Sequence, residues 1–238
     1  MGYIKNGLKE AVRIARREPP VTPGEFDLST LPALLGKHDP TILEIGCNDG
    51  GQTRDFLKHF SNATIFAFEP DPRARARFAA AVQDPRVTLL DLAISDTNGE
   101  IDFHMSSGAP SAEVAAQLPD GWDLSGSIKK PTGHLNALPW CTFDQHIKVK
   151  TMTLDTWCTN AGIQAIDFIW ADVQGAEADL IRGGQAALAN TRYFYTEYSD
   201  RELYEGQLSL RALLALLPDF KVIHRFSGDV LLKNTRDR

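Results

Sequence analysis

The chain contains 238 residues, 43% of them hydrophobic and 24% charged, with a formal net charge of -6 at pH 7. This size predicts one α/β domain with additions rather than two complete domains. The negative charge argues against nucleic acid and anionic membranes as partners, because phosphate-rich surfaces attract basic proteins. Since the sequence has neither an apolar run of about 18 residues nor a signal-peptide pattern, we expect a cytoplasmic protein. The odd number of cysteines, Cys47, Cys141 and Cys158, fits a reducing compartment.

Residues 1–40 predict a helical arm ahead of the domain. Apolar residues recur at near-helical spacing over 3–17, and the Pro-Pro pair at 19–20 would end this helix. A second short helix is predicted around 28–35. The domain itself is expected over 41–238. The amphipathic arm leaves open whether it packs on its own domain or on a second copy in a homo-oligomer.

Strands and helices alternate from residue 41 onward. The segments TILEIG, ATIFAFE and RVTLLDLAIS predict strands over 41–46, 63–69 and 86–95, with helical spacing in the segments between them. Continuous apolar strands separated by helices indicate parallel βαβ units in which helices cover both faces of the sheet.

The chain changes character after residue 96. A turn (SDTNG) and a short strand (IDFHM) lead into residues 106–146, which are rich in Gly, Pro and Ser and show no clear period. A long irregular stretch inside a compact domain is usually functional or mobile, so we interpret 106–146 as a lid or acceptor-binding insertion. The alternative, a disordered surface excursion, is disfavoured by apolar residues such as Trp122 and Trp140.

The alternation resumes with strands predicted over 147–154, 165–172 and 191–198. The chain closes with a helix over 208–220 and two strands, KVIHRF and VLLKN, joined by a tight turn. A terminal hairpin places one antiparallel strand in an otherwise parallel sheet. We therefore predict an α/β fold with a mostly parallel sheet and an antiparallel C-terminal hairpin strand.

The first strand ends in a glycine loop, ILEIGCNDGG, at the position where open α/β sheets bind nucleotides. The dinucleotide pattern GxGxxG fails because Asn48 stands at its middle glycine. The pattern present is ExGxxxG, formed by Glu44, Gly46 and Gly50. Glycines let the backbone lie close to a ligand, and an acid at a strand end can accept a ligand ammonium. This suits a cofactor with an amino-acid end and no pyrophosphate.

The second and third strands also end in acids. Glu69, in FAFEP, can accept hydrogen bonds from both ribose hydroxyls, or it can serve only as an acid before the next helix. Asp91, or the backbone near Ala93, could meet an adenine edge; a solvated Asp91 is the competing interpretation.

The segments ILEIGCNDG, FAFEP, LDLAISDTNGEIDF, TMTLDTW and IDFIWADVQGAEADLIRGG occur in this order, and with them the sequence resembles the FkbM family of S-adenosylmethionine-dependent methyltransferases. The resemblance covers about residues 41–200. It implies a class I methyltransferase (Rossmann-like) fold and O-methylation of a small-molecule acceptor, a hydroxyl of a sugar or natural product. The motif match implies which residues contact each part of the cofactor. The methionine end would be bound by Glu44, Gly46, Asn48 and Gly50, the ribose by Glu69, and the adenine by Asp91 and Ala93.

Two further acids end adjacent strands, Asp172 before a glycine turn and Glu197 in YFYTEY. Two carboxylates at neighbouring strand ends could hold Mg²⁺. Without a metal, Asp172 would orient or deprotonate the acceptor. A histidine of the insertion, His134 or His146, would serve as base, and His104 is a weaker candidate for the same role.

The first acid is followed by the turn and helix start of DVQGAE. Glu177 has a simpler interpretation as an acid in the first helical turn, and Gly175 would permit the turn. Asp155 is interpreted in the same way, as a cap at a helix start.

Two other functions remain open at this point. A nucleotide-dependent oxidoreductase could use a related sheet, although the missing glycine at position 48 argues against it. A non-catalytic cofactor-binding module is also conceivable, and the intact acids argue against that.

Overall fold

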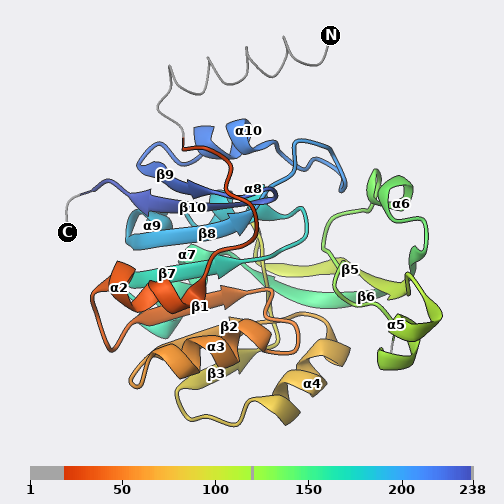
Figure 1. The fold of residues 1–238 in the computed structure, drawn as a ribbon, viewed down its shortest axis with the longest axis horizontal. Helices are drawn as coiled ribbons and strands as arrows, with labels where there is room; N and C mark the ends of the chain where they lie inside the picture. Colours follow the sequence, from red (N-terminus) through yellow and green to blue (C-terminus); the bar gives the residue numbers. More distant parts are fainter. Residues whose placement is uncertain (1–18, 119–120, 237–238) are drawn as a thin grey trace.

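The computed structural model describes residues 19–118 and 121–236, so the helix predicted over 3–17 lies outside the described residues. A seven-stranded sheet forms the centre of the molecule (Figure 1). Its strands are β1 (Thr41–Ile45), β2 (Thr64–Phe68), β3 (Val87–Leu90), β7 (Ile166–Ala171), β8 (Thr191–Glu197), β9 (Phe220–Arg225) and β10 (Asp229–Asn234).

The spatial order of the main sheet is β3-β2-β1-β7-β8-β10-β9. The pairs from β3 to β8 are parallel, and β10 runs antiparallel to both of its neighbours. The predicted α/β fold, with one antiparallel strand from a C-terminal hairpin, is confirmed. The strand order reverses beside β1, so the carboxyl ends of β1 and β7 open a crevice there.

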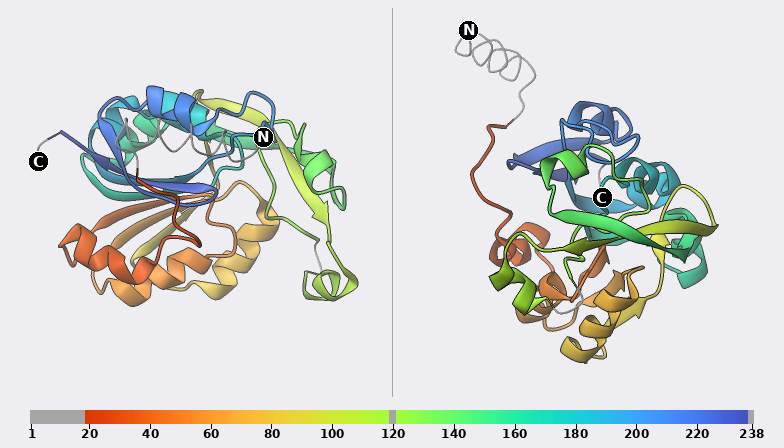
Figure 2. Two further views of the ribbon diagram at one scale, coloured as in Figure 1. Left: turned by 45° about the horizontal axis from the view of Figure 1, so that its top comes forward. Right: turned by 90° about the vertical axis from the view of Figure 1, so that its right-hand side faces the viewer.

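Helices cover both faces of this sheet (Figure 2). The neighbours Ile42 and Leu43 of β1 enter opposite cores, as expected for a strand buried on both sides. Leu43 joins the core beneath α7–α10, and Ile42 joins the core beneath η1, α2 and α3, while α4 packs through Phe78. The helix bounds are η1 (Leu28–Thr30), α2 (Leu31–Leu35), α3 (Gly51–His59), α4 (Pro72–Ala81), α7 (Leu154–Ala161), α8 (Glu177–Gly183), α9 (Gln185–Ala189) and α10 (Leu210–Ala215).

A second sheet has the order β4-β6-β5 and consists of β4 (Ala93–Ile94), β5 (Gly99–Gly108) and β6 (Cys141–Met152). The prediction of one strand over 86–95 was therefore wrong. β3 ends at Leu90, and after a break at Asp91 and Leu92 the chain pairs with β6 instead of β2. Both halves are apolar, so the sequence pattern does not reveal that they join different sheets.

The insertion is shorter than predicted, because both of its ends belong to a long hairpin. β5 continues to Gly108 and β6 begins at Cys141, which leaves 109–140 as the excursion at the hairpin tip (Figure 1). The described part of this excursion includes the short helices α5 (Ala112–Gln117) and α6 (His134–Ala137).

The segment before η1 runs toward the C-terminal hairpin. Thr22 N donates to Arg225 O, and the Phe26 ring lies 5.8 Å from that of Tyr195. The predicted short helix at 28–35 is present as η1 and α2. No helix within the described ranges is long and apolar enough to cross a membrane.

Candidate active site

The glycine loop after β1 lies against the end of β7. Gly46 has φ +86°, and a Cβ at this position would lie 1.8 Å from the carbonyl oxygen of Asp172, so only glycine allows the two strand ends to approach this closely. Gly50 precedes α3 with φ +82°, and a Cβ there would meet the Phe78 ring at 2.9 Å. The glycines of the ExGxxxG pattern therefore bring the loop close to β7 and α4.

The loop satisfies its own backbone amides. The amide of Asn48 donates to Glu69 Oε2 at 2.9 Å, and that of Asp49 donates to the Asn48 side chain at 2.8 Å. The amides at positions 46, 47, 50 and 51 also have acceptors within the chain. Glycine loops that bind phosphate present free amides to it, so this loop is not built to bind a pyrophosphate.

Glu44 lies beneath the loop and is fully buried. One of its oxygens accepts a hydrogen bond from the Thr53 hydroxyl of α3, and Oε1 has no partner among the described residues. Burial raises the pKa of Glu44 to about 8. The structure thus places Glu44 behind the loop, where it anchors α3, and it does not line the cavity described next.

A cavity of about 300 Å³ opens at the carboxyl ends of β1, β2 and β7. Gly46, Asn48, Glu69, Ala93 and Asp172 all line it. Among the predicted cofactor residues, Gly50 and Asp91 are absent from the lining. The Asp91 side chain is 58% exposed and forms an ion pair with Arg75 at 2.7 Å.

Glu69 is held by the backbone at the cavity edge. Its Oε1 accepts from the amide of Asp71 at 2.8 Å, in addition to the bond from Asn48 to Oε2. Burial raises the pKa of Glu69 to about 7. Each carboxylate oxygen has a second lone pair, so Glu69 retains acceptor capacity toward a ligand.

The insertion supplies another wall of this cavity, with Asp123, Leu124, Gly126, Ser127 and Ile128. The Asp123 carboxylate pairs with Arg77 of α4, and Ser127 Oγ donates to Gln174 O at 2.7 Å. The sequence predicted a lid or acceptor-binding insertion from its long irregular stretch, and that role stays a prediction. The sequence could not select these residues, because their position depends on contacts with α4 and the β7 turn.

The predicted pair Asp172 and Glu197 meets at this cavity, joined by Gln174. Gln174 Nε2 donates to Asp172 Oδ1 at 2.6 Å and to Glu197 Oε2 at 3.2 Å. On its other side, Gln174 Oε1 lies 3.0 Å from the Tyr204 hydroxyl, which also lies 2.9 Å from Ser125 O. Gln174 has φ +48°, and this left-handed turn brings its side chain back over the strand ends.

Burial and mutual repulsion set the protonation of the two acids. Burial raises the pKa of Asp172. Burial, together with the negative charge of Asp172, raises the pKa of Glu197 to about 10. The raised pKa keeps Glu197 protonated near neutral pH.

The arrangement around Asp172 and Glu197 does not fit Mg²⁺. Mg²⁺ requires oxygen ligands in a near-octahedral set, whereas the group between these carboxylates is the amide nitrogen of Gln174, a hydrogen-bond donor. The described ranges also hold no cluster of three or more His, Cys, Asp or Glu residues suited to a metal ion.

The structure does not bring the candidate histidines to the cavity. His134 is 3% exposed, and its ring packs 5.1 Å from that of Phe143 and 5.4 Å from that of Tyr204. His146 lies opposite His104 across the β5–β6 hairpin, with ring centroids 4.6 Å apart, and both line a different cavity. The sequence did not indicate which face of the β5–β6 hairpin His104 and His146 occupy.

Glu177 begins α8 as predicted, and its Oε1 accepts from the amide of Gly175 at 3.0 Å. A Cβ on Gly175, which has φ +92°, would lie 2.6 Å from the Tyr204 Cβ. Asp155 was predicted to cap the helix in which it lies. Instead it accepts from the amide of Ala187 at 2.7 Å at the start of α9, while Thr153 caps α7.

The chain matches the methyltransferase FkbM domain over residues 44–227. It is 53% identical over 209 residues to the 2-O-methyltransferase NoeI of Sinorhizobium fredii, which covers 86% of this chain and 83% of that protein. Among solved structures, a fibrillarin pre-rRNA processing protein of Methanococcus jannaschii aligns at 10% identity with a TM-score of 0.47, covering 84% of this chain and 69% of that chain. A putative rRNA methylase from Clostridium thermocellum aligns at 11% identity with a TM-score of 0.46, covering 88% of this chain and 94% of that chain. On the family match and the NoeI identity, the chain belongs to the FkbM family of methyltransferases.

Proposed function

We propose that this methyltransferase transfers the methyl group of S-adenosylmethionine to a hydroxyl of a small molecule, a sugar or a natural product. The observation that carries the proposal is the cavity in which the glycine loop, Glu69 and Asp172 converge at three neighbouring strand ends. The similarity to a 2-O-methyltransferase supports oxygen as the methylated atom.

The cavity residues fit the parts of this cofactor. Gly46 and Asn48 would lie along its methionine end, Glu69 would accept from the ribose hydroxyls, and the apolar wall at Ala93 and Leu92 would receive the adenine. The loop amides are satisfied internally, which suits a cofactor without phosphates. The same feature weighs against the alternative of a nucleotide-dependent oxidoreductase.

When bound, the cofactor supplies a sulfonium methyl group that an aligned oxygen can displace. Asp172 lines the cavity, and its carboxylate would accept the proton that the acceptor hydroxyl loses. Gln174 keeps both carboxyl groups in place through its amide. In this proposal the proton acceptor is therefore a carboxylate, and no histidine is required.

Calorimetry with S-adenosylhomocysteine, the demethylated cofactor, tests the proposal. Glu69→Gln should weaken binding by roughly 1 to 3 kcal/mol, because the amide loses acceptor capacity toward the ribose. The matched control Glu100→Gln, an exposed residue of β5, should bind like the wild type. Asp172→Asn should keep this binding and lose methyl transfer. Absence of binding by the wild type would end the proposal.

Predictions about partners come from the sequence. The net charge of -6 predicts no nucleic-acid or membrane partner. A cytoplasmic location and a homo-oligomer formed through the arm also stay predictions.

A further inference from the structure

The side-chain amide of Gln174 has a direction, and the acids depend on it. Its nitrogen donates to Asp172 Oδ1 at 2.6 Å and to Glu197 Oε2 at 3.2 Å, while its oxygen faces away from both. The acids alone do not settle this direction, because protonated Glu197 can donate to the oxygen of a reversed amide. A reversed amide would no longer donate to Asp172. Another group must therefore hold the amide oxygen on the far side.

The Tyr204 hydroxyl meets the amide oxygen on that side, 3.0 Å from Gln174 Oε1. It is the one donor to this oxygen within the part of the chain that the structure describes. Burial raises the pKa of Tyr204, so its hydroxyl keeps its proton. The hydroxyl also lies 2.9 Å from Ser125 O of the insertion. Two acceptors thus face one proton, and a three-centre hydrogen bond lets them share it.

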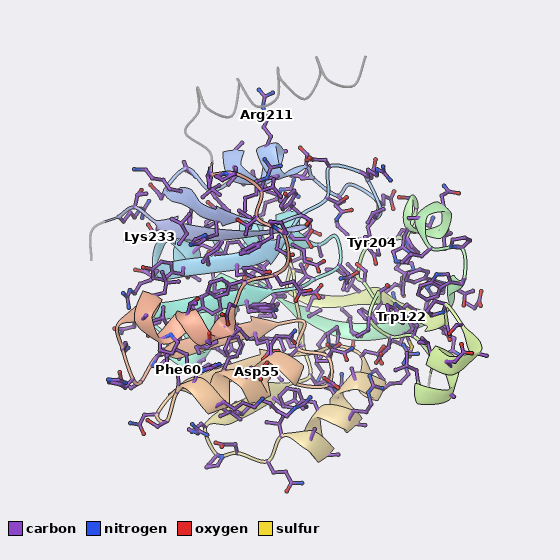
Figure 3. The ribbon with its side chains drawn as sticks, viewed as in Figure 1. Asp55, Phe60, Trp122, Tyr204, Arg211 and Lys233 are labelled. Atoms are coloured by element: carbon purple, nitrogen blue, oxygen red, sulfur yellow. The ribbon has the colours of Figure 1, made fainter. Side chains whose placement is uncertain are left out.

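Tyr204 is itself fixed between the insertion and the segment that follows β8 (Figure 3). It is 1% exposed and forms an antiparallel bridge with Pro131 of the insertion. Its ring packs 5.4 Å from that of His134. On the side of the β7 turn, only a glycine at position 175 leaves room for it, since a Cβ there would lie 2.6 Å from the Tyr204 Cβ. A hydroxyl on so constrained a ring can orient the group it contacts.

We propose that Tyr204 is a positioning residue for methyl transfer, whose hydroxyl fixes the direction of the Gln174 amide and thereby keeps a donor on the Asp172 carboxylate. The proposal rests on the proposed function, because that function makes Asp172 the proton acceptor. Tyr204 does not line the cofactor cavity, so its effect on the reaction passes through Gln174.

The expected effect of losing the hydroxyl is a higher pKa of Asp172. Burial raises the pKa of Asp172, and the hydrogen bond from Gln174 opposes this rise. Without the Tyr204 hydroxyl the amide can reverse and accept from Glu197, which withdraws its bond from Asp172. Other acids also act on Glu197, and they are the same in wild type and variant. They are Glu177 of α8, Asp229 of β10 and Glu25 of the segment before η1.

The test variant is Tyr204→Phe, which removes the hydroxyl and keeps the ring. The matched control is Tyr198→Phe. Tyr198 is 8% exposed, and its hydroxyl donates to Phe226 O at 2.8 Å and accepts from Arg225 Nε at 3.0 Å. The control therefore also removes a buried hydroxyl with two partners. Gln174→Met removes the amide and keeps the length of the side chain, alone and combined with Tyr204→Phe.

The measurement is an NMR titration of the aspartate carboxyl carbons in the protein without cofactor, with the Asp172 signal assigned through Asp172→Asn. Gln174→Met should raise the Asp172 midpoint by roughly one to two pH units, and Tyr204→Phe by roughly one. In the combined variant Tyr204→Phe should add nothing, because no amide remains to be positioned. Tyr198→Phe should titrate like the wild type.

Three results would overturn the inference. If Tyr204→Phe leaves the Asp172 midpoint unchanged, the hydroxyl proton serves Ser125 alone. If its shift adds in full to that of Gln174→Met, Tyr204 does not act through the amide. If Tyr198→Phe causes the same shift, the effect is a general loss of packing.

Neutron diffraction from deuterated wild-type crystals gives a check that holds whether or not Tyr204→Phe folds. The Tyr204 deuteron should point toward Gln174 Oε1, with the deuterated amide nitrogen toward Asp172; a reversed amide would refute the inference. Neither experiment uses cofactor or acceptor. If the wild type does not bind S-adenosylhomocysteine, the proposed function fails, and the direction of the amide is still decided by these measurements.

Discussion

The substitution Gln174→Glu changes one atom type at the centre of the site and keeps the shape of the side chain. In the wild type, Nε2 donates to Asp172 at 2.6 Å and to Glu197 at 3.2 Å. A hydrogen bond to a charged group contributes about 1.5 to 3 kcal/mol, and one between neutral groups, such as the bond to protonated Glu197, about 0.5 to 1.5 kcal/mol. The variant replaces both bonds with contacts between carboxyl groups. We expect the free energy of unfolding at pH 8 to fall by about 3 to 5 kcal/mol in EDTA.

The loss should appear as a melting temperature lowered by roughly 6 to 20 °C, since 1 kcal/mol corresponds to about 2 to 4 °C in a domain of this size. It should shrink as the pH falls toward 5. A third carboxyl among two acids has a raised pKa in the folded state, so the folded variant takes up a proton more readily than the unfolded chain.

A divalent cation should rescue the variant and leave the wild type unchanged. Three carboxyl groups in place of two carboxylates and an amide form an oxygen site that Ca²⁺ or Mg²⁺ can occupy. A cation at 100 times its dissociation constant stabilises a folded protein by about 2.7 kcal/mol. The measurement is thermal unfolding at pH 8, in EDTA and in about 10 mM CaCl₂ or MgCl₂. This concentration is about 100 times a dissociation constant of roughly 0.1 mM.

The matched control is Gln207→Glu, the same substitution in the segment between β8 and α10. Gln207 Oε1 accepts from the amide of Leu203 at 3.0 Å, and a carboxylate can accept that bond equally well, so its stability should change little. The reasoning is refuted if Gln174→Glu is as stable as the wild type in EDTA at pH 8. It is also refuted if the cations stabilise the wild type as much as the variant.

Two further predictions concern the glycine loop. Gly46→Ala should lower the free energy of unfolding by about 2 to 3 kcal/mol more than Gly162→Ala. Both positions have positive φ, but only at Gly46 would a Cβ meet backbone, the Asp172 oxygen at 1.8 Å; equal losses in chemical denaturation would contradict this. Glu44, whose pKa burial raises to about 8, binds its proton more tightly in the folded state, so stability should fall as pH rises from about 5 to 8. Glu44→Gln should flatten this slope by up to roughly 4 kcal/mol across that range, and an unchanged slope would show that the folded Glu44 has an ordinary pKa.

Residues at strand ends were the most predictable part of the site. Parallel strands meet at one edge, so Gly46, Glu69, Asp172 and Glu197 could be expected to lie together from the alternation of strands and helices alone. Gln174 could not, because its role depends on a left-handed turn at φ +48° that the sequence does not encode locally.

The fold was also largely predictable, and the parts of its prediction that were wrong depend on contacts between distant segments. The succession of strands along the chain and the antiparallel hairpin followed from local patterns. The division of 86–95 between two sheets and the length of the β5–β6 hairpin depend on which distant strand supplies the hydrogen bonds. The histidines were misleading because residue type suggested a base, whereas the hairpin directs His104 and His146 to another surface.

The anchoring of the insertion has a consequence for protein engineering. Because Asp123 is tied to Arg77 of α4 and Ser127 to the turn at Gln174, the insertion is fixed as a wall of the cofactor cavity. Exchanging residues 109–140 between relatives would therefore not transplant substrate preference as a separate module. Such chimaeras should change their affinity for the methyl donor at the same time, unless the partners on α4 and β7 are exchanged with the loop.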